Sequence, residues 1–128
     1  MAQARRKTSG PSEHDEQKAV FEIAALHETK WPELQLLHAV PNGGHRHKAT
    51  AVRLKAEGVR AGVPDIDLPV KRGKYTGLHI EMKVWPNKAT PEQKAWLKAL
   101  RGQGRYCTVC YGANEAWAII MRYLTGDL

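Results

Sequence analysis

Two short apolar runs constrain the fold of this chain more than any other feature. VPDIDLPV occupies 63–70 and GLHIEMKVW occupies 77–85, with Gly73 in the connection between them. Apolar runs on either side of a short connection that contains glycine predict a β-hairpin. Each run nevertheless carries acidic residues, and a charge in a buried strand costs several kcal/mol unless it is paired or binds a metal ion. The fold must therefore bring these carboxylates to a partner or to solvent.

The charges of the second run follow strand geometry. Glu81 and Lys83 are two positions apart, so both project from one face of a strand while Met82 takes the opposite face. Asp65, near the end of the neighbouring strand, can bring its carboxylate to that of Glu81. Spacing alone also allows a second interpretation, in which Glu81 and Lys83 form an exposed pair on an edge strand and Asp65 caps a turn.

Converging carboxylates indicate a particular chemistry. Two such groups repel each other, and a divalent cation is the usual way to neutralise them. Their hard oxygen ligands favour Mg²⁺ or Mn²⁺ over zinc. A lysine beside them can orient or help deprotonate an attacking water. Asp65, Glu81 and Lys83 together therefore suit hydrolysis of a phosphodiester.

Patterns outside the hairpin predict an α/β domain. Ser12 followed by acidic residues indicates a helix N-terminus, and Thr90 with Pro91 and Gln93 indicates another. The element order is α-β-α-β-β-α-β-α. The predicted helices cover 13–29, 47–58, 90–104 and 113–124, and the predicted strands cover 34–40, 63–71, 77–85 and 105–111.

Length and charge bound the remaining possibilities. The 128 residues suffice for one hydrophobic core, so we expect a flexible basic arm at 1–12 and a single domain at 13–128. A formal net charge of +7 favours a polyanionic partner such as nucleic acid. No apolar run is long enough for a membrane span and no signal peptide is recognisable, so we expect no membrane association and a cytoplasmic location.

The cysteines raise a zinc hypothesis that strand geometry disfavours. Cys107 and Cys110 have the CxxC spacing, but RYCTVCYG is typical of a strand. Side chains at these two positions would point to opposite faces of that strand. With no second CxxC pair, two reduced structural cysteines are the favoured interpretation.

Several motifs resemble one nuclease family. Pro64-Asp65 followed by Glu81-Met82-Lys83 resembles the signature of the PD-(D/E)xK nucleases, and GVRAGVPD at 58–65 is similar to the VRR-NUC family of that superfamily. The run that names the family is usually Val-Arg-Arg and stands here as Val59-Arg60-Ala61, so the second arginine is missing. The resemblance extends over nearly everything from residue 12 onward. Its other segments are SEHDEQ at 12–17, PNGG at 41–44, TPEQKAWLKAL at 90–100 and a closing strand before NEAW.

The resemblance implies roles for individual residues. Asp65 and Glu81 would be metal-binding carboxylates, Met82 would lend its backbone carbonyl to the metal, and Lys83 would be the catalytic lysine. The family also uses an acidic residue on the first helix, for which the spacing to Gln17 favours Glu13 over Glu16.

Three further side chains complete the candidate site. Gln17 lies four residues after Glu13 and shares its helix face, so both can reach one site. Gln93 matches a family glutamine that touches water or phosphate, although it can equally be the capping-box partner of Thr90. Asp67 shares a strand face with Asp65 and is a weaker ligand candidate.

The resemblance also implies a fold, an activity and partners. The fold would be restriction-endonuclease-like, a mixed β-sheet flanked by helices. The activity would be that of a Mg²⁺- or Mn²⁺-dependent DNA endonuclease. Similar stand-alone proteins are phage or bacterial, and some act as homodimers on branched DNA such as Holliday junctions. We therefore expect DNA, branched or duplex, as the partner, and structure-selective cleavage by a homodimer.

A basic series supplies candidates for DNA contact, because phosphate contacts give affinity that does not depend on sequence. A solvated basic face is the alternative interpretation, and Trp96 is expected in the core or an interface rather than against a base. Two other functions also stay open: a non-catalytic DNA-binding module, and an HNH-type nuclease that uses His45 or His47. The DNA-binding candidates are Asn42, Lys48, Arg53, Lys55 and Arg60.

Overall fold

The computed structural model describes residues 10–41 and 48–128, with the side chain of Lys48 excepted. Most of the predicted arm at 1–12 lies outside these ranges, as do Asn42, His45 and His47. The elements are α1 (Glu13–His27), the 3-10 helix η2 (Pro32–Leu36), β1 (His38–Ala39), α2 (Lys48–Ala56), β2 (Ile66–Leu68), β3 (Leu78–Lys83), α3 (Pro91–Gly102), β4 (Tyr106–Tyr111) and α4 (Ala113–Thr125).

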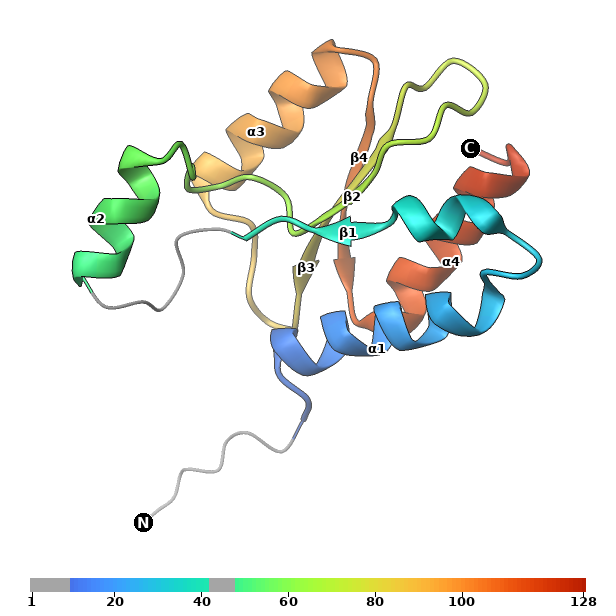
Figure 1. Cartoon of the computed structure of the whole chain (residues 1–128), viewed down its shortest axis with the longest axis horizontal. Helices are drawn as coiled ribbons and strands as arrows, with labels where there is room; N and C mark the ends of the chain where they lie inside the picture. Colours follow the sequence, from blue (N-terminus) through green and yellow to red (C-terminus); the bar gives the residue numbers. More distant parts are fainter. Residues whose placement is uncertain (1–9, 42–47) are drawn as a thin grey trace.

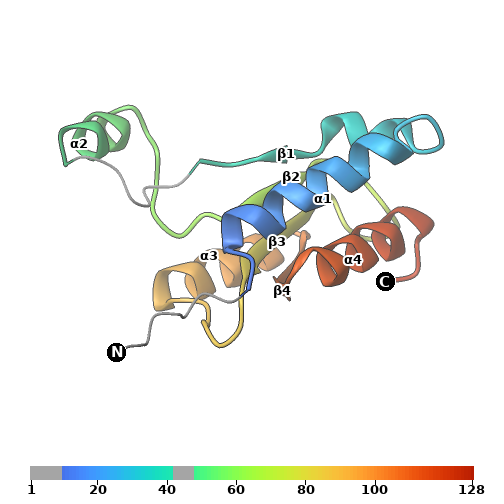
Figure 2. The same ribbon diagram turned by 90° about the horizontal axis from the view of Figure 1, so that it is seen from below.

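The four strands form one mixed sheet in the order β1-β2-β3-β4. β1 and β2 pair antiparallel, as do β2 and β3, whereas β3 and β4 run parallel. α3 makes the crossover between the two parallel strands, and α1 and α4 lie side by side against the sheet (Figures 1 and 2). This arrangement confirms the predicted α/β fold with a mixed sheet flanked by helices.

The predicted hairpin is confirmed, with Ile66 opposite Ile80 and Leu68 opposite Leu78. These four side chains and Met82 are almost fully buried in the core with residues of α1 and α4. Burying side chains of this size stabilises a domain by roughly 1.5–3 kcal/mol each. The core therefore sits on the face opposite Glu81 and Lys83, as strand alternation predicts.

The predicted strand at 34–40 is wrong in its first half. Leu34 lies in η2, and only His38–Ala39 pairs as a strand. Leu34 and Leu37 are both buried and three residues apart, which is the spacing of a helical turn rather than of a strand. Pro32 begins this turn because its fixed φ suits a first helical position. The order of the other elements is as predicted.

The first strand of the hairpin is shorter than the predicted 63–71. β2 spans only Ile66–Leu68, and Pro64 and Pro69 lie outside its two ends. Proline has no backbone N–H to donate to a neighbouring strand, so pairing stops near each of them. The consequence for the site is that Asp65 stands just outside β2, with its side chain bound to the backbone of β3.

The helix starts agree with the capping signals. Ser12 and Asp15 form a capping box at α1, and Thr90 and Gln93 form one at α3.

Both cysteines are buried, and neither forms a disulfide. Burial raises the pKa of both thiols, that of Cys110 to about 12, which makes both unreactive. Within the described ranges, none of the helices has the length and apolar character that crossing a bilayer requires.

Candidate active site

Asp65 is anchored to β3 by its side chain. Met82 donates its backbone N–H to Asp65 Oδ2 at 2.8 Å. Because the β2–β3 pairing ends at Ile66 and Ile80, this N–H lies beyond the ladder and takes a side-chain acceptor instead. The bond holds the Asp65 carboxylate over the end of β3, next to Glu81.

Glu81 is a buried acid in an unfavourable position for a negative charge. Its residue is 1% exposed, and its Oε1 has no hydrogen-bond partner among the described residues. Burial raises the pKa of Glu81 to about 8, and the charge of Asp65 and a hydrogen bond to it add to the rise. Lys83 acts in the opposite direction, while Glu13 contributes a further rise. The carboxyl therefore requires a proton or an additional cation near neutral pH.

Lys83 is the buried cation of the site. Its Nζ lies 3.8 Å from Glu81 Oε2, and the side chains of Lys83 and Glu81 are 8% and 2% exposed. This distance is that of an ion pair rather than a direct hydrogen bond. The two side chains project from the same face of β3, as their spacing predicted. The exposed edge-strand pair that spacing alone allowed is therefore wrong, because β3 is a central strand and both residues are buried.

The two acidic candidates on α1 have different surroundings. Glu16 Oε1 accepts a hydrogen bond from the backbone N–H of Ala113 at 2.6 Å, at the start of α4. Gly112, which precedes Ala113, has no side chain of its own for this cap, so Glu16 supplies one from α1. Glu13 is close enough to Glu81 to raise its pKa. The structure thus turns Glu16 toward α4 and leaves Glu13 as the α1 acid that influences Glu81, with Gln17 half-buried on the same helix.

Glu16→Ala is expected to destabilise the domain by about 1–2 kcal/mol, because the N-terminus of α4 loses a negatively charged cap. Urea denaturation would measure the change, with Glu22→Ala, an exposed position on α1, as the control. Unchanged stability together with a loss of DNA cleavage as large as that of Glu13→Ala would contradict this assignment.

Gln93 forms the capping box with Thr90 that the sequence allowed as an alternative to a catalytic role. Its Oε1 accepts the backbone N–H of Thr90 at 2.9 Å, while Thr90 Oγ1 accepts the N–H of Gln93 at 3.2 Å. The capping box is therefore present, and contact of Gln93 with water or phosphate stays a prediction.

A second polar group lies along the same face of the sheet. Asp67 is 3.6 Å from His38 and 4.0 Å from His79, and Arg105 donates to Nε2 of His79 at 2.8 Å. Burial lowers the pKa of His79, so its ring is neutral near neutral pH. Sequence reasoning missed His79, although it alternates with Glu81 in HIEMK and so shares its face.

The donor set fits a hard divalent cation with few protein ligands. Within the described ranges, no three His, Cys, Asp or Glu side chains gather in a metal-binding arrangement. Mg²⁺ is commonly held by one or two carboxylates, with water and substrate phosphate at its other positions. The unpartnered Oε1 of Glu81, buried beside Asp65, is the observation that fits such an ion.

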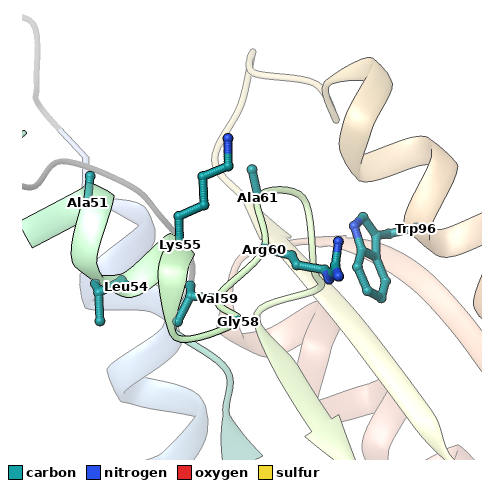
Figure 3. A pocket seen from close by; sticks show the side chains of 8 residues that line it. All are labelled: Ala51, Leu54, Lys55, Gly58, Val59, Arg60, Ala61 and Trp96. Atoms are coloured by element: carbon teal, nitrogen blue, oxygen red, sulfur yellow. The ribbon is translucent and has the colours of Figure 1, made fainter.

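The described DNA-binding candidates lie on α2 and the loop that follows it. Arg53 is exposed in the last turn of α2. Lys55 and Arg60 line a hollow that also contains Trp96, so Trp96 is only half-buried (Figure 3). Lys48 begins α2, and Asn42 falls outside the described residues.

Comparisons with known proteins agree with this geometry. The model of the VRR-NUC domain family matches residues 11–114, which include Asp65, Glu81 and Lys83. The chain belongs to the VRR-NUC domain family. A solved structure described as a "VRR_NUC domain protein" is 29% identical, has a TM-score of 0.78 and matches over 91% of each chain. No match was found among curated proteins.

Membership of the family settles the broad activity. VRR-NUC is a family of nuclease domains, and its nucleases are generally dependent on divalent metal. The chain is accordingly a nuclease domain, and the family predicted from the motifs is confirmed. Ala61 in place of the second motif arginine does not remove the chain from the family.

Proposed function

We propose that this VRR-NUC domain is an endonuclease that hydrolyses phosphodiester bonds of DNA with Mg²⁺ or Mn²⁺ held by Asp65 and Glu81. The observation that supports it best is Glu81, a buried acid with a raised pKa that lies beside a second carboxylate and a lysine and has one oxygen without a hydrogen-bond partner in the described part of the chain. A structural acid in such a place would be unfavourable, whereas a metal ligand there is neutralised when the cation binds.

Asp65, Glu81 and Lys83 have different roles in the proposed reaction. Asp65 and Glu81 would hold the divalent cation, which would polarise the scissile phosphate and make a bound water more acidic. Asp65, held by the N–H of Met82, presents its carboxylate in one orientation, and Glu81, whose pKa is raised, would ionise when a cation is bound beside it. Lys83 orients the attacking water and offsets charge that develops on the phosphate.

Three other groups support this centre. Glu13 reaches it from α1, close enough to influence Glu81, and Gln17 shares the helix face of Glu13. The backbone carbonyl of Met82 is a further ligand candidate at the end of β3, and Gln93 lies at the start of α3 where it can meet water or phosphate.

The mode of DNA binding is argued from charge and size. Basic side chains of α2 and the following loop supply phosphate contacts, which provide affinity without sequence selection. A single chain of 128 residues has little surface for a DNA branch, whereas a two-fold homodimer presents two active sites to opposed strands. A four-way junction is therefore the favoured substrate. The candidate contacts are Asn42, Lys48, Arg53, Lys55 and Arg60.

Cleavage assays with three substrates test this function. In Mg²⁺ or Mn²⁺ we expect a labelled four-way junction to be cut faster than a flap or a linear duplex, and EDTA to stop all cutting. Light scattering should give the mass of a dimer. Equal cutting of the three substrates would remove the selectivity, and DNA binding without cutting in any metal would favour a non-catalytic module.

The HNH alternative makes an opposite prediction for two groups of residues. Under our proposal, Asp65→Ala abolishes cleavage while His45→Ala and His47→Ala retain it. An HNH nuclease would show the reverse pattern. Cleavage rates of the three variants on one substrate decide between the two.

A further inference from the structure

A cavity of about 500 Å³ lies between α2 and α3, outside the carboxylate site (Figure 3). Apolar side chains of α2 and of the following loop, among them Leu54 and Val59, form much of its wall. The indole of Trp96 faces it from α3. Lys55 and Arg60 are the basic side chains of its lining, and Figure 3 shows Arg60 extended toward Trp96.

A second hollow adjoins the cavity. A neighbouring hollow of about 430 Å³ shares Arg60 and Trp96 with it and reaches Val40 and Val63; Glu57 is its acidic lining residue. Val40 donates its backbone N–H to the carbonyl of Asp65 at 2.8 Å, and Val63 precedes Asp65 by two residues. The second hollow therefore extends from the cavity to the backbone next to Asp65, although the Asp65 and Glu81 side chains line neither hollow.

Close packing of the loop at Gly62 fixes the position of α3, which carries Trp96. Gly62 has a φ of +92°, and a Cβ added there would lie 3.0 Å from the backbone of Glu92 and from Cδ1 of Trp96. The loop that leads to Asp65 thus packs directly on the first turns of α3, where only glycine fits. Trp96 is one helical turn after Gln93, so the two side chains lie on the same side of α3.

We propose that this cavity binds an unpaired nucleotide of the DNA strand next to the cut, with its base against Trp96 and its phosphate against Lys55 and Arg60. The volume lies within the range of about 300–1,000 Å³ that small-ligand pockets have. An aromatic ring surrounded by apolar side chains suits a flat base, and adjacent lysine and arginine suit a phosphate. The proposal rests on the proposed function, because it assigns the strand that reaches Asp65 and Glu81.

Equilibrium binding in EDTA tests the cavity without cleavage. The probes are a short labelled oligothymidylate and a strand of equal length that has the same sugar-phosphate backbone without bases, measured by fluorescence anisotropy. We expect the wild type to bind the strand with bases about tenfold more tightly, since stacking of a base on an aromatic side chain has an effect of this order.

Variants separate the contribution of the base to binding affinity from that of the phosphate. Trp96→Leu should lose most of the preference for bases while keeping its affinity for the strand without bases. Arg60→Gln should weaken both strands alike, and more than Lys98→Gln, an exposed position on α3 outside the lining. Ala51→Met places a larger helix-compatible side chain in the cavity and should also remove the preference, without deleting a core group.

Three results would overturn the proposal. They are equal affinity of the wild type for both strands, a preference that survives in both Trp96→Leu and Ala51→Met, and an equal effect of Arg60→Gln and Lys98→Gln. A preference for bases that depends on Trp96 in a protein that cuts no DNA would support the cavity and contradict the nuclease function, so the two failures are distinguishable.

Discussion

Lys83→Met is expected to lower the rate of DNA cleavage by about 10²–10⁴-fold, the usual effect of removing a positioned catalytic group. The methionine keeps much of the side-chain length and removes the charge that lies 3.8 Å from Glu81 Oε2. Single-turnover cleavage in saturating Mg²⁺ would measure the loss, because excess metal compensates for any weaker binding of the cation. Circular dichroism and a thermal melt would show that the variant is folded.

The matched control for this variant is Lys71→Met. Lys71 is exposed in the connection between β2 and β3, at the end of the hairpin away from Asp65. Its replacement removes the same charge from the chain and should leave the cleavage rate unchanged. A Lys83→Met protein that cuts as fast as the Lys71→Met protein would exclude Lys83 from catalysis.

Glu81→Gln is expected to make the metal-free domain more stable at alkaline pH. Burial raises the pKa of Glu81 from 4.5 to about 8, so the folded state holds this proton more tightly than the unfolded state. The stability that Glu81 contributes is therefore full below pH 4.5 and is lost as the pH rises toward 8. At about 1.36 kcal/mol for each pH unit, the loss is on the order of 5 kcal/mol.

Glutamine keeps the shape of the protonated acid and cannot ionise, so the variant should lack this loss. Urea denaturation in EDTA at pH 5 and pH 9 would measure the free energy of unfolding of both proteins. Mg²⁺ should stabilise the wild type at pH 9 and have little effect on Glu81→Gln. If the free energies of unfolding of the two proteins depend equally on pH in EDTA, the pKa of Glu81 is not raised in the folded state.

Local patterns were informative wherever one physical rule dominated. Alternation along HIEMKV places Glu81 and Lys83 on one face and Met82 in the core, and each of these positions is as predicted. The run at 34–40 was ambiguous, because short apolar runs suit a strand or a turn of helix equally well. Burial of Leu34 and Leu37 together, which requires the fold around them, selected the turn.

Glu13 and Glu16 show most clearly the difference between what the sequence determines and what only the tertiary structure decides. By itself the sequence determined that acidic residues begin α1 and that Glu81 and Lys83 share one face of a strand, because capping and alternation are local. Only the tertiary structure decided that Glu16 caps α4, that His79 lies beside Asp67, and that Trp96 lines a cavity with Lys55 and Arg60. These contacts join segments distant along the chain, and their geometry is set by how helices and strands pack rather than by any local pattern of residues.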